Sequence, residues 1–244
     1  MTEVRIEELL GGFPKRAPES HKNDFGHILV IAGSMCYTGA AYLASQAAIL
    51  SGSGLVTLAV GKSIHSIMAA KLTEVMVTPF FETRDASLSL LAEKELLSFG
   101  EKCGAIAIGP GISQNKETQN LVRNLIVKFA KPMVLDADGI NALAGHPDIL
   151  KNAKAPLILT PHPGEMSRLI AKEKDEVQKN RKEIAINFAK EYNTVLVLKG
   201  HNTVVAGPQG EFYINATGNA GMATGGVGDI LTGVIASFIG QGLD

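Results

Sequence analysis

Short apolar runs rich in Val, Ile and Leu alternate along this chain with longer segments in which apolar residues recur at helical spacing. Continuously apolar runs are typical of strands buried on both faces, as in a parallel sheet covered by helices on each side. The pattern predicts an α/β fold, a three-layer αβα sandwich with a mostly parallel central sheet. One large domain of this class commonly has about 244 residues, so we expect a single domain over residues 1–244.

Individual elements can be placed from the same pattern. The strand candidates are His27–Ala32, Leu55–Val60, Ala105–Ile108, Met133–Leu135, Leu157–Leu159 and Val195–Leu198. The helix candidates between them are Gly39–Ser51, Ser87–Phe99 and Asp175–Tyr192. Near the end, Thr203–Ala206 and Glu211–Ile214 flank the turn residues Gly207–Gly210, which predicts a β-hairpin.

Charge and cysteine usage limit the environment and the partners. Lys plus Arg total 23 against 24 Asp plus Glu, so no general positive field attracts nucleic acid or an anionic membrane. Cys36 and Cys103 have no disulfide or zinc-ligand spacing, which favours a reducing cytoplasm. Met1–Ser20 contains no apolar run like a signal peptide, and no segment has the ~20 apolar residues of a membrane helix. We expect a soluble cytoplasmic protein.

The most informative motif is the glycine-rich segment Gly221–Asp229, which is followed by the apolar segment Ile230–Ile239. A glycine-rich loop that opens a helix predicts an anion site, because glycines let amide groups converge and the helix dipole adds partial positive charge. Gly226, Val227 and Gly228 are the candidates for this phosphate cradle.

Asp229 lies at the mouth of the predicted cradle. A carboxylate there would repel phosphate, but it is well placed to take a proton from a substrate hydroxyl as a catalytic base. The alternative is that Asp229 only caps or favours the helix N-terminus, a common role for Asp in a first turn. The residue pattern alone leaves both interpretations open.

Two common nucleotide-binding folds are disfavoured by their missing fingerprints. The segment Gly33–Gly39 lacks the Gly-Lys-Ser/Thr ending that supplies the lysine of a P-loop kinase. The glycine spacing after the first strand is wrong for a Rossmann dehydrogenase, and no acidic residue ends Leu55–Val60.

The segment Gly-Met-Ala-Thr-Gly-Gly-Val-Gly-Asp at 221–229 resembles the corresponding loop of ADP/ATP-dependent NAD(P)H-hydrate dehydratases, a branch of the ribokinase-like proteins. The other blocks that resemble this family are His21-Lys22, Gly26-His27, Gly33-Ser34, Thr38–Ala40, Ile108–Gly111, Leu135–Asn141, Leu159–Glu165 and Leu198–Thr203. Together they cover about residues 20–244, and the combination of Pro-His-Pro-Gly-Glu with Gly-Gly-x-Gly-Asp is specific.

The resemblance implies a ribokinase-like fold and a repair reaction on hydrated NADH or NADPH. The 6-hydroxyl of the S epimer would be phosphorylated from ADP or ATP, accompanied by Mg²⁺, and phosphate would then be eliminated to restore NAD(P)H. By match to the family, Asp229 would remove the hydroxyl proton, and Gly226, Val227 and Gly228 would stabilise the transferring phosphoryl group. Bacterial single-domain relatives suggest ADP as the donor.

The resemblance also implies two binding subsites. The nucleotide-binding candidates are Lys199, Gly200, His201, Asn202 and Thr203 together with Gly228. The substrate-binding candidates are Ala40, Gly111 and His162 together with Asp229. Plainer interpretations exist for each group: a polar strand-to-hairpin turn, helix packing at Ala40, a loop turn at Gly111, and a surface or satisfied core histidine at His162.

Acidic residues after two strands leave the metal ligands unassigned. Asp136 could hold Mg²⁺ indirectly or cap a helix and stays open, whereas capping is the preferred interpretation of Asp138. Glu165 fits metal or phosphate surroundings but equally the first turn of a helix, so we leave it out of the catalytic set.

Three classes of function remain: the repair dehydratase, a ribokinase-like kinase of a hydroxymethylpyrimidine, hydroxyethylthiazole or sugar, and a nucleotide-binding module without turnover. A catalytic base at Asp229 argues against the last. Related chains continue for at least one helix beyond residue 244 and often carry an N-terminal epimerase domain, for which about 20 residues are too few. We therefore expect a separate epimerase, a chain without the last helix, and a homotetramer as in relatives.

Overall fold

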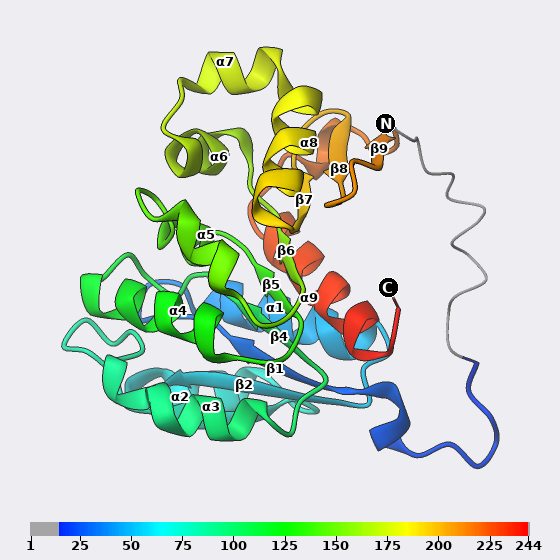
Figure 1. Cartoon of the computed structure of the whole chain (residues 1–244). Coiled ribbons are helices and arrows are strands. Elements are labelled where there is room, and N and C mark those ends of the chain that lie inside the picture. Colours follow the sequence, from blue (N-terminus) through cyan, green and yellow to red (C-terminus); the bar gives the residue numbers. More distant parts are fainter. Residues whose placement is uncertain (1–14, 244) are drawn as a thin grey trace.

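The computed structural model describes residues 15–243, so most of Met1–Ser20, the segment expected to lack a signal peptide, lies outside the described residues, as does Asp244. A single nine-stranded sheet in the order β3-β2-β1-β4-β5-β6-β7-β8-β9 runs through the molecule. Helices lie on both sides of this sheet (Figure 1). The predicted three-layer α/β architecture is confirmed.

The element bounds follow the alternation seen in the sequence. The strands are β1 (His27–Ile31), β2 (Leu55–Gly61), β3 (Met76–Phe80), β4 (Ala105–Ile108), β5 (Met133–Leu135), β6 (Leu157–Leu159), β7 (Val195–Leu198), β8 (Thr203–Ala206) and β9 (Phe212–Asn215). The helices are α1 (Thr38–Leu50), α2 (Lys62–Lys71), α3 (Glu93–Gly100), α4 (Lys116–Lys128), α5 (Asp138–Asn141), α6 (Pro163–Ile170), α7 (Lys174–Lys179), α8 (Arg181–Tyr192) and α9 (Val227–Gly240). Short 3₁₀ turns are η3 (Lys22–Phe25), η4 (Leu90–Ala92), η5 (Pro147–Asn152) and η6 (Ala220–Met222).

The strand direction reverses twice, at β8 and again at β9. All neighbouring strands from β3 to β7 pair in parallel, whereas β7 with β8 and β8 with β9 pair antiparallel. The predicted hairpin is therefore present, with Ala206 opposite Phe212 and the amide of Gly207 donating to Glu211 O. Its second strand begins one residue later than expected.

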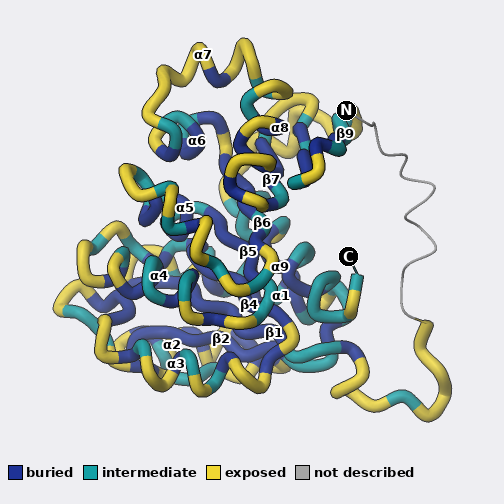
Figure 2. The backbone as a smooth tube through the Cα atoms, in the orientation of Figure 1, coloured by how far each residue is buried: buried dark blue, intermediate teal, exposed yellow. Residues whose placement is uncertain are grey.

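Two hydrophobic cores fill the spaces between the sheet and its helices. Strand β1 contributes to both, because Leu29 and Ile31 belong to the larger core and Ile28 and Val30 to the other. Helices α1, α2 and α9 cover one face, and helices α3 to α8 cover the other. The central strands are accordingly buried along their length (Figure 2), as continuous apolar runs predict.

Two predicted helices differ from the structure. The segment 175–192 is two helices, because Asn180 leaves the helical conformation (φ −120°, ψ 29°) between α7 and α8. In the segment 87–99, the hydroxyl of Ser89 accepts from the amide of Leu91 and starts a 3₁₀ turn, and α3 begins only at Glu93. Local side-chain bonds thus replace the first turns of the expected helix.

The described residues include no helix long and apolar enough to cross a membrane. Both cysteines are free thiols: Cys36 is exposed, and Cys103 is buried.

Candidate active site

A cleft of about 1060 Å³ opens at the carboxyl ends of the strands, on the side of β5 to β9. Its walls are the segments that follow β5, β6 and β7, together with residues 215–220 and 222–229, which connect β9 to α9. Ligands of open α/β sheets bind at this edge, where successive loops converge. The cleft brings together most residues that the sequence marked as functional.

The glycine-rich segment ends at the N-terminus of α9, as predicted. Gly226 is the N-cap residue with a φ of 95°, and the first hydrogen bond of the helix runs from the amide of Ile230 to Gly226 O. The amides of Val227, Gly228 and Asp229 therefore precede the helical hydrogen-bond ladder and are oriented like the free donors of a helix start. This is the geometry of an anion site.

Asp229 lies in the first turn of α9 and lines the cleft. Its side chain makes no capping bond at this helix start, although its place in the first turn still suits a carboxylate that favours the helix N-terminus. Burial, followed by the negative charge of Asp136, raises its pKa from 3.8 to about 6, while Lys199 acts in the opposite direction. A carboxyl group with a pKa near neutrality is suited to take a proton.

Lys199, which follows β7, faces the buried carboxylates of Asp136 and Glu165, which follow β5 and β6. Its Nζ donates to Oδ1 of Asp136 at 2.7 Å and lies 3.9 Å from Oε2 of Glu165. Thr160 donates its hydroxyl to the same oxygen of Asp136 at 2.8 Å. A Cβ atom placed on Gly228 would lie 3.3 Å from this Nζ, so the ammonium group adjoins the start of α9. A full positive charge thus adjoins the anion site.

The turn Lys199–Asn202 joins β7 to β8 and forms one wall of the cleft. The amide of Gly200 donates to the hydroxyl of Thr203, and that hydroxyl donates to Gly200 O. Asn202 has a left-handed φ of 57°, and His201 is exposed. Of the predicted nucleotide-binding set, only Asn202 is not in the wall of the cleft.

His162 lies in the wall of the cleft and also begins α6 as its N-cap residue. Its Nδ1 accepts from the amides of Gly164 (2.9 Å) and Glu165 (3.2 Å), while Glu165 accepts from the amide of His162. Burial, then the charge of Lys199, lowers the pKa of His162. The ring is therefore neutral at physiological pH, with one nitrogen engaged in capping and about half of its side chain exposed.

Ala40, in the first turn of α1, and Gly111, in the loop after β4, lie next to each other outside the wall of the described cleft. A Cβ atom on Gly111 would lie 3.0 Å from that of Ala40 and 2.5 Å from that of Tyr37. Leu43, one turn after Ala40 in α1, approaches Gly226. These two small residues thus adjoin the start of α9 on the side of β1 and β4.

Asp138 does not cap α5. Ala137 occupies the N-cap position, and the carboxylate of Asp138 instead accepts from the amide of Ser113 and the side chains of Gln114 and Asn141. Within residues 15–243, no group of three or more His, Cys, Asp or Glu side chains could hold a metal ion.

A family model described as NAD(P)H-hydrate dehydratase matches residues 28–244. The ADP-dependent (S)-NAD(P)H-hydrate dehydratase of Bacillus subtilis strain 168 is 36% identical over 235 residues, which are 96% of this chain and 79% of that protein. The chain belongs to the NAD(P)H-hydrate dehydratase family.

Other family members are longer than this chain. It is 46% identical over 230 residues to the bifunctional NAD(P)H-hydrate repair enzyme Nnr of Moorella thermoacetica, covering 94% of this chain but only 43% of that protein. The chain thus spans less than half the length of this bifunctional relative.

Solved structures confirm the ribokinase-like fold of this family member. The ADP/ATP-dependent NAD(P)H-hydrate dehydratase of Bacillus subtilis, co-crystallised with ATP/Mg²⁺, superposes with a TM-score of 0.81 at 36% identity, over 98% of this chain and 81% of that chain. A ribokinase-like superfamily protein of Enterococcus faecalis has a TM-score of 0.80 at 26% identity, over 98% and 80% of the two chains.

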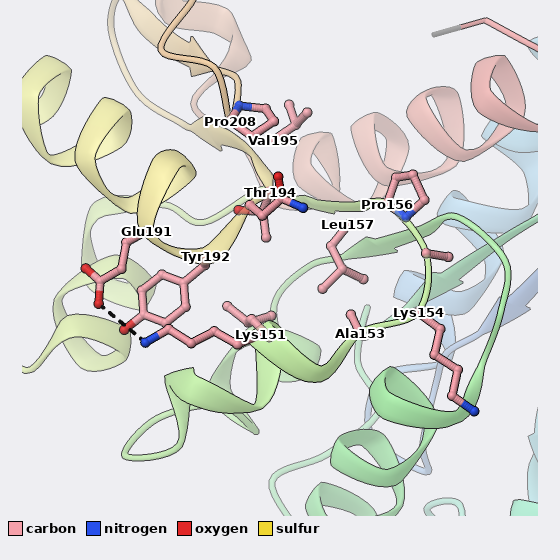
Figure 3. Close-up of a pocket in the computed structure, with 13 residues that line it drawn as sticks. Lys151, Ala153, Lys154, Pro156, Leu157, Glu191, Tyr192, Thr194, Val195 and Pro208 are labelled. Carbon is pink, nitrogen blue, oxygen red and sulfur yellow. Dashed lines mark ion pairs between the residues drawn. The ribbon is translucent and has the colours of Figure 1, made fainter.

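A second cavity, of about 450 Å³, lies at the opposite edge of the sheet, where β6 and β7 begin (Figure 3). In its wall, Lys151 lies 3.9 Å from Glu191 and also pairs with Asp148 at 2.6 Å. The amino ends of parallel strands are not where α/β enzymes of this type bind ligands. The larger cleft is therefore the candidate active site of this dehydratase-family chain.

Sequence reasoning missed the partnership of Asp136, Glu165 and Lys199. The sequence alone suggests a separate role for each residue: an acidic residue without a fixed role, a first-turn helix residue and a nucleotide contact. In the structure, the carboxylates of Asp136 and Glu165 both face the ammonium group of Lys199. The signal that could have found them is position: each follows a predicted parallel strand, and such strand ends share one edge. Arg181, which binds the turn after β7, gave no sequence signal.

Proposed function

We propose that this chain is an ADP- or ATP-dependent NAD(P)H-hydrate dehydratase, a carbon–oxygen lyase of metabolite repair that acts on the S epimer of hydrated NADH and NADPH. The observation that carries the proposal is the position of Asp229, whose carboxyl group makes no capping bond and has a pKa of about 6. It lies beside the amides of Val227 and Gly228 and near Lys199. A base and an anion site lie at the same point.

The proposed first step is phosphorylation of the 6-hydroxyl of the hydrated ring. Asp229 takes the hydroxyl proton while the oxygen attacks the terminal phosphorus, and the bond from that phosphorus to the rest of the nucleotide breaks. The amides of Gly226, Val227 and Gly228, with the ammonium group of Lys199, stabilise the charge on the phosphoryl oxygens.

In the second step the phosphorylated oxygen leaves as inorganic phosphate. The lone pair of the ring nitrogen displaces it, the carbon–oxygen bond breaks, and loss of a proton from the adjacent ring carbon restores the double bond of NAD(P)H. Hydroxide is a poor leaving group at neutral pH, so this sequence explains why a kinase-type site serves a dehydration. The residues of this chain act mainly in the first step.

We assign the two subsites to opposite sides of Asp229. The nucleotide would lie in the cleft against Lys199, Gly200, His201 and Thr203, with Gly228 at its phosphates. Asn202 would complete the same turn without lining the cleft. The hydrated dinucleotide would approach from the side of Ala40 and Gly111, whose small side chains leave room near the backbone, with His162 as a further contact.

Mg²⁺ fits as an ion carried by the nucleotide. The described residues offer no cage of three acidic or histidine ligands, and the carboxylates of Asp136 and Glu165 already face Lys199. Mg²⁺ is commonly held by substrate phosphates with one or two carboxylates and several waters. When bound, it would supply charge neutralisation on the phosphate oxygens.

The proposed assembly is a cytoplasmic homotetramer that depends on a separate NAD(P)H-hydrate epimerase for the other epimer. Support for self-association comes from exposed apolar side chains on the α1–α9 layer, such as Leu50 (77% exposed) and Ile230 (42%). Light scattering coupled to size-exclusion chromatography tests the tetramer, and a monomer at micromolar concentration would contradict it.

The function is tested by mixing the purified chain and Mg²⁺ with chemically hydrated NADH and either ADP or ATP. Nucleotide-dependent recovery of the near-ultraviolet absorbance of the reduced nicotinamide, with one inorganic phosphate released per NADH, is the expected result. Release of phosphate without recovery, or neither with both nucleotides, would refute the proposal. Phosphate retained on an organic product would instead indicate a small-molecule kinase.

A further inference from the structure

Arg181 is the first residue of α8 and lies behind the turn Lys199–Asn202. One terminal nitrogen of its guanidinium group donates to Leu198 O at 2.7 Å, and the other donates to His201 O. The two carbonyl groups flank Lys199 and Gly200, so a single side chain spans the part of the turn that lines the cleft. Arg181 itself is not in the cleft wall.

The position of Arg181, at a helix N-terminus and partly buried, is electrostatically unfavourable for a positive charge. A positive charge at a helix N-terminus opposes the helix dipole, and burial of the guanidinium group lowers the pKa of Arg181. Among residues 15–243 no acidic side chain forms an ion pair with Arg181, and its Nε is buried without a hydrogen-bond partner. Local conflicts of this kind are expected at functional sites.

We propose that Arg181 is a positioning residue for the nucleotide subsite, holding the turn Lys199–Asn202 in its binding shape through the carbonyl groups of Leu198 and His201. This inference rests on the proposed function, because it assigns the role of Arg181 to the nucleotide side of the same site. A guanidinium group is suited to this task, since its planar donors bind two acceptors at once.

Gly200 packs against the guanidinium group of Arg181, where a residue without a side chain is needed. Its φ of 144° is one that side chains rarely adopt, and a Cβ atom there would lie 3.1 Å from three atoms of the guanidinium group. The amide of the preceding Lys199 donates to Pro161 O at 2.9 Å. The backbone of the turn is therefore fixed on both sides, which directs the Lys199 ammonium group toward Asp136 and the start of α9.

The test compares Arg181→Met and Arg181→Lys with wild type in the full chain. Isothermal titration calorimetry with Mg²⁺ and ADP gives the Kd, and steady-state assays give kcat and both KM values. Arg123→Met is the matched control, because Arg123 also donates to a carbonyl at 2.6 Å, but that carbonyl belongs to Ala142, which is outside the cleft wall, unlike His201.

We expect Arg181→Met to raise the Kd for ADP about tenfold and also to lower kcat, because Lys199 stabilises the transferring phosphoryl group, while the KM for hydrated NADH stays within about twofold of wild type. The Kd for ADP of Arg181→Lys should lie between those of wild type and Arg181→Met, because an ammonium group lacks the planar pair of donors that reaches both carbonyl groups. Arg123→Met should lower the melting temperature without changing the Kd.

The inference is overturned by an unchanged Kd in a folded Arg181→Met variant, or by equal losses in ADP binding and in the KM for hydrated NADH. If Arg181→Met does not fold, Arg181→Lys and Gly200→Ala decide, and wild-type ADP affinity in both overturns it. A wild-type chain that binds neither ADP nor ATP refutes the proposed function itself, which separates the two failures.

Discussion

Asp229→Asn should make the protein more stable at neutral pH while removing most turnover. In the folded chain the pKa of Asp229 is raised from 3.8 to about 6, chiefly by burial. Above pH 6 the folded state must therefore hold a poorly solvated carboxylate that the unfolded chain solvates freely. Asparagine keeps the shape of the side chain without the charge, so the variant avoids this cost and also lacks the base.

The magnitude follows from linkage. At about 1.4 kcal/mol per pKa unit, the difference between 3.8 and about 6 corresponds to at most about 3 kcal/mol. Because the carboxylate faces an open cleft, screening by solvent reduces the expected gain to about 1–2 kcal/mol. For a chain of this size each kcal/mol raises the melting temperature by about 2–4 °C.

The sign fixes the pH window. Below about pH 4 Asp229 is protonated in both states and resembles asparagine, so wild type and variant should have equal free energies of unfolding. The difference should open between about pH 4 and pH 6 and then stay constant, as measured by urea titration of the nucleotide-free protein. The assignment of a raised pKa to Asp229 would be refuted if the difference in free energy of unfolding between variant and wild type were the same at pH 4 and pH 8. It would also be refuted if the variant were less stable than wild type at pH 8.

Three further predictions concern the same cleft. The kcat/KM of wild type should rise with pH through about 6, as Asp229 loses its proton, and a profile that is flat between pH 5 and pH 8 would contradict its role as the base. Gly228→Ala should lower kcat at least about tenfold in assays at saturating nucleotide, because the new methyl group would lie 3.3 Å from Nζ of Lys199 at the anion site. Lys199→Met should cost about 3 kcal/mol in urea titration by leaving Asp136 buried without its cation, and a smaller loss in Asp136→Asn/Lys199→Met would identify the pair as the cause.

The central strands were predictable because burial on both faces leaves continuous apolar runs. Strand β3 was missed for the opposite reason: it lies at the edge of the sheet, contains Pro79, and only Phe80 of its five residues is buried. The break between α7 and α8 was missed because Asn180 interrupts an otherwise helical pattern without Gly or Pro. Edges and breaks of this kind depend on tertiary contacts.

The anion cradle was predictable from the sequence because its parts are contiguous: Gly226, Val227, Gly228 and Asp229 form one turn of chain. The charge cluster beside it was not, since Asp136 and Lys199 are 63 residues apart and meet only through the strand order. Arg181 acts on backbone carbonyls, which every residue has, so no residue type in the turn reveals its partner.

The reversal of direction between β7 and β8 accounts for both the cleft and its dependence on Arg181. After a parallel strand the chain normally leaves the edge through a crossover helix, but here the turn Lys199–Asn202 returns it at once to β8. The turn residues therefore stay at the carboxyl edge, where Lys199 adjoins the start of α9. The carbonyl groups of Leu198 and His201, which flank Lys199 and Gly200 in this turn, both accept from side-chain donors. Arg181 supplies both from outside the sheet, so the same reversal that forms the nucleotide wall makes its shape depend on a side chain of α8.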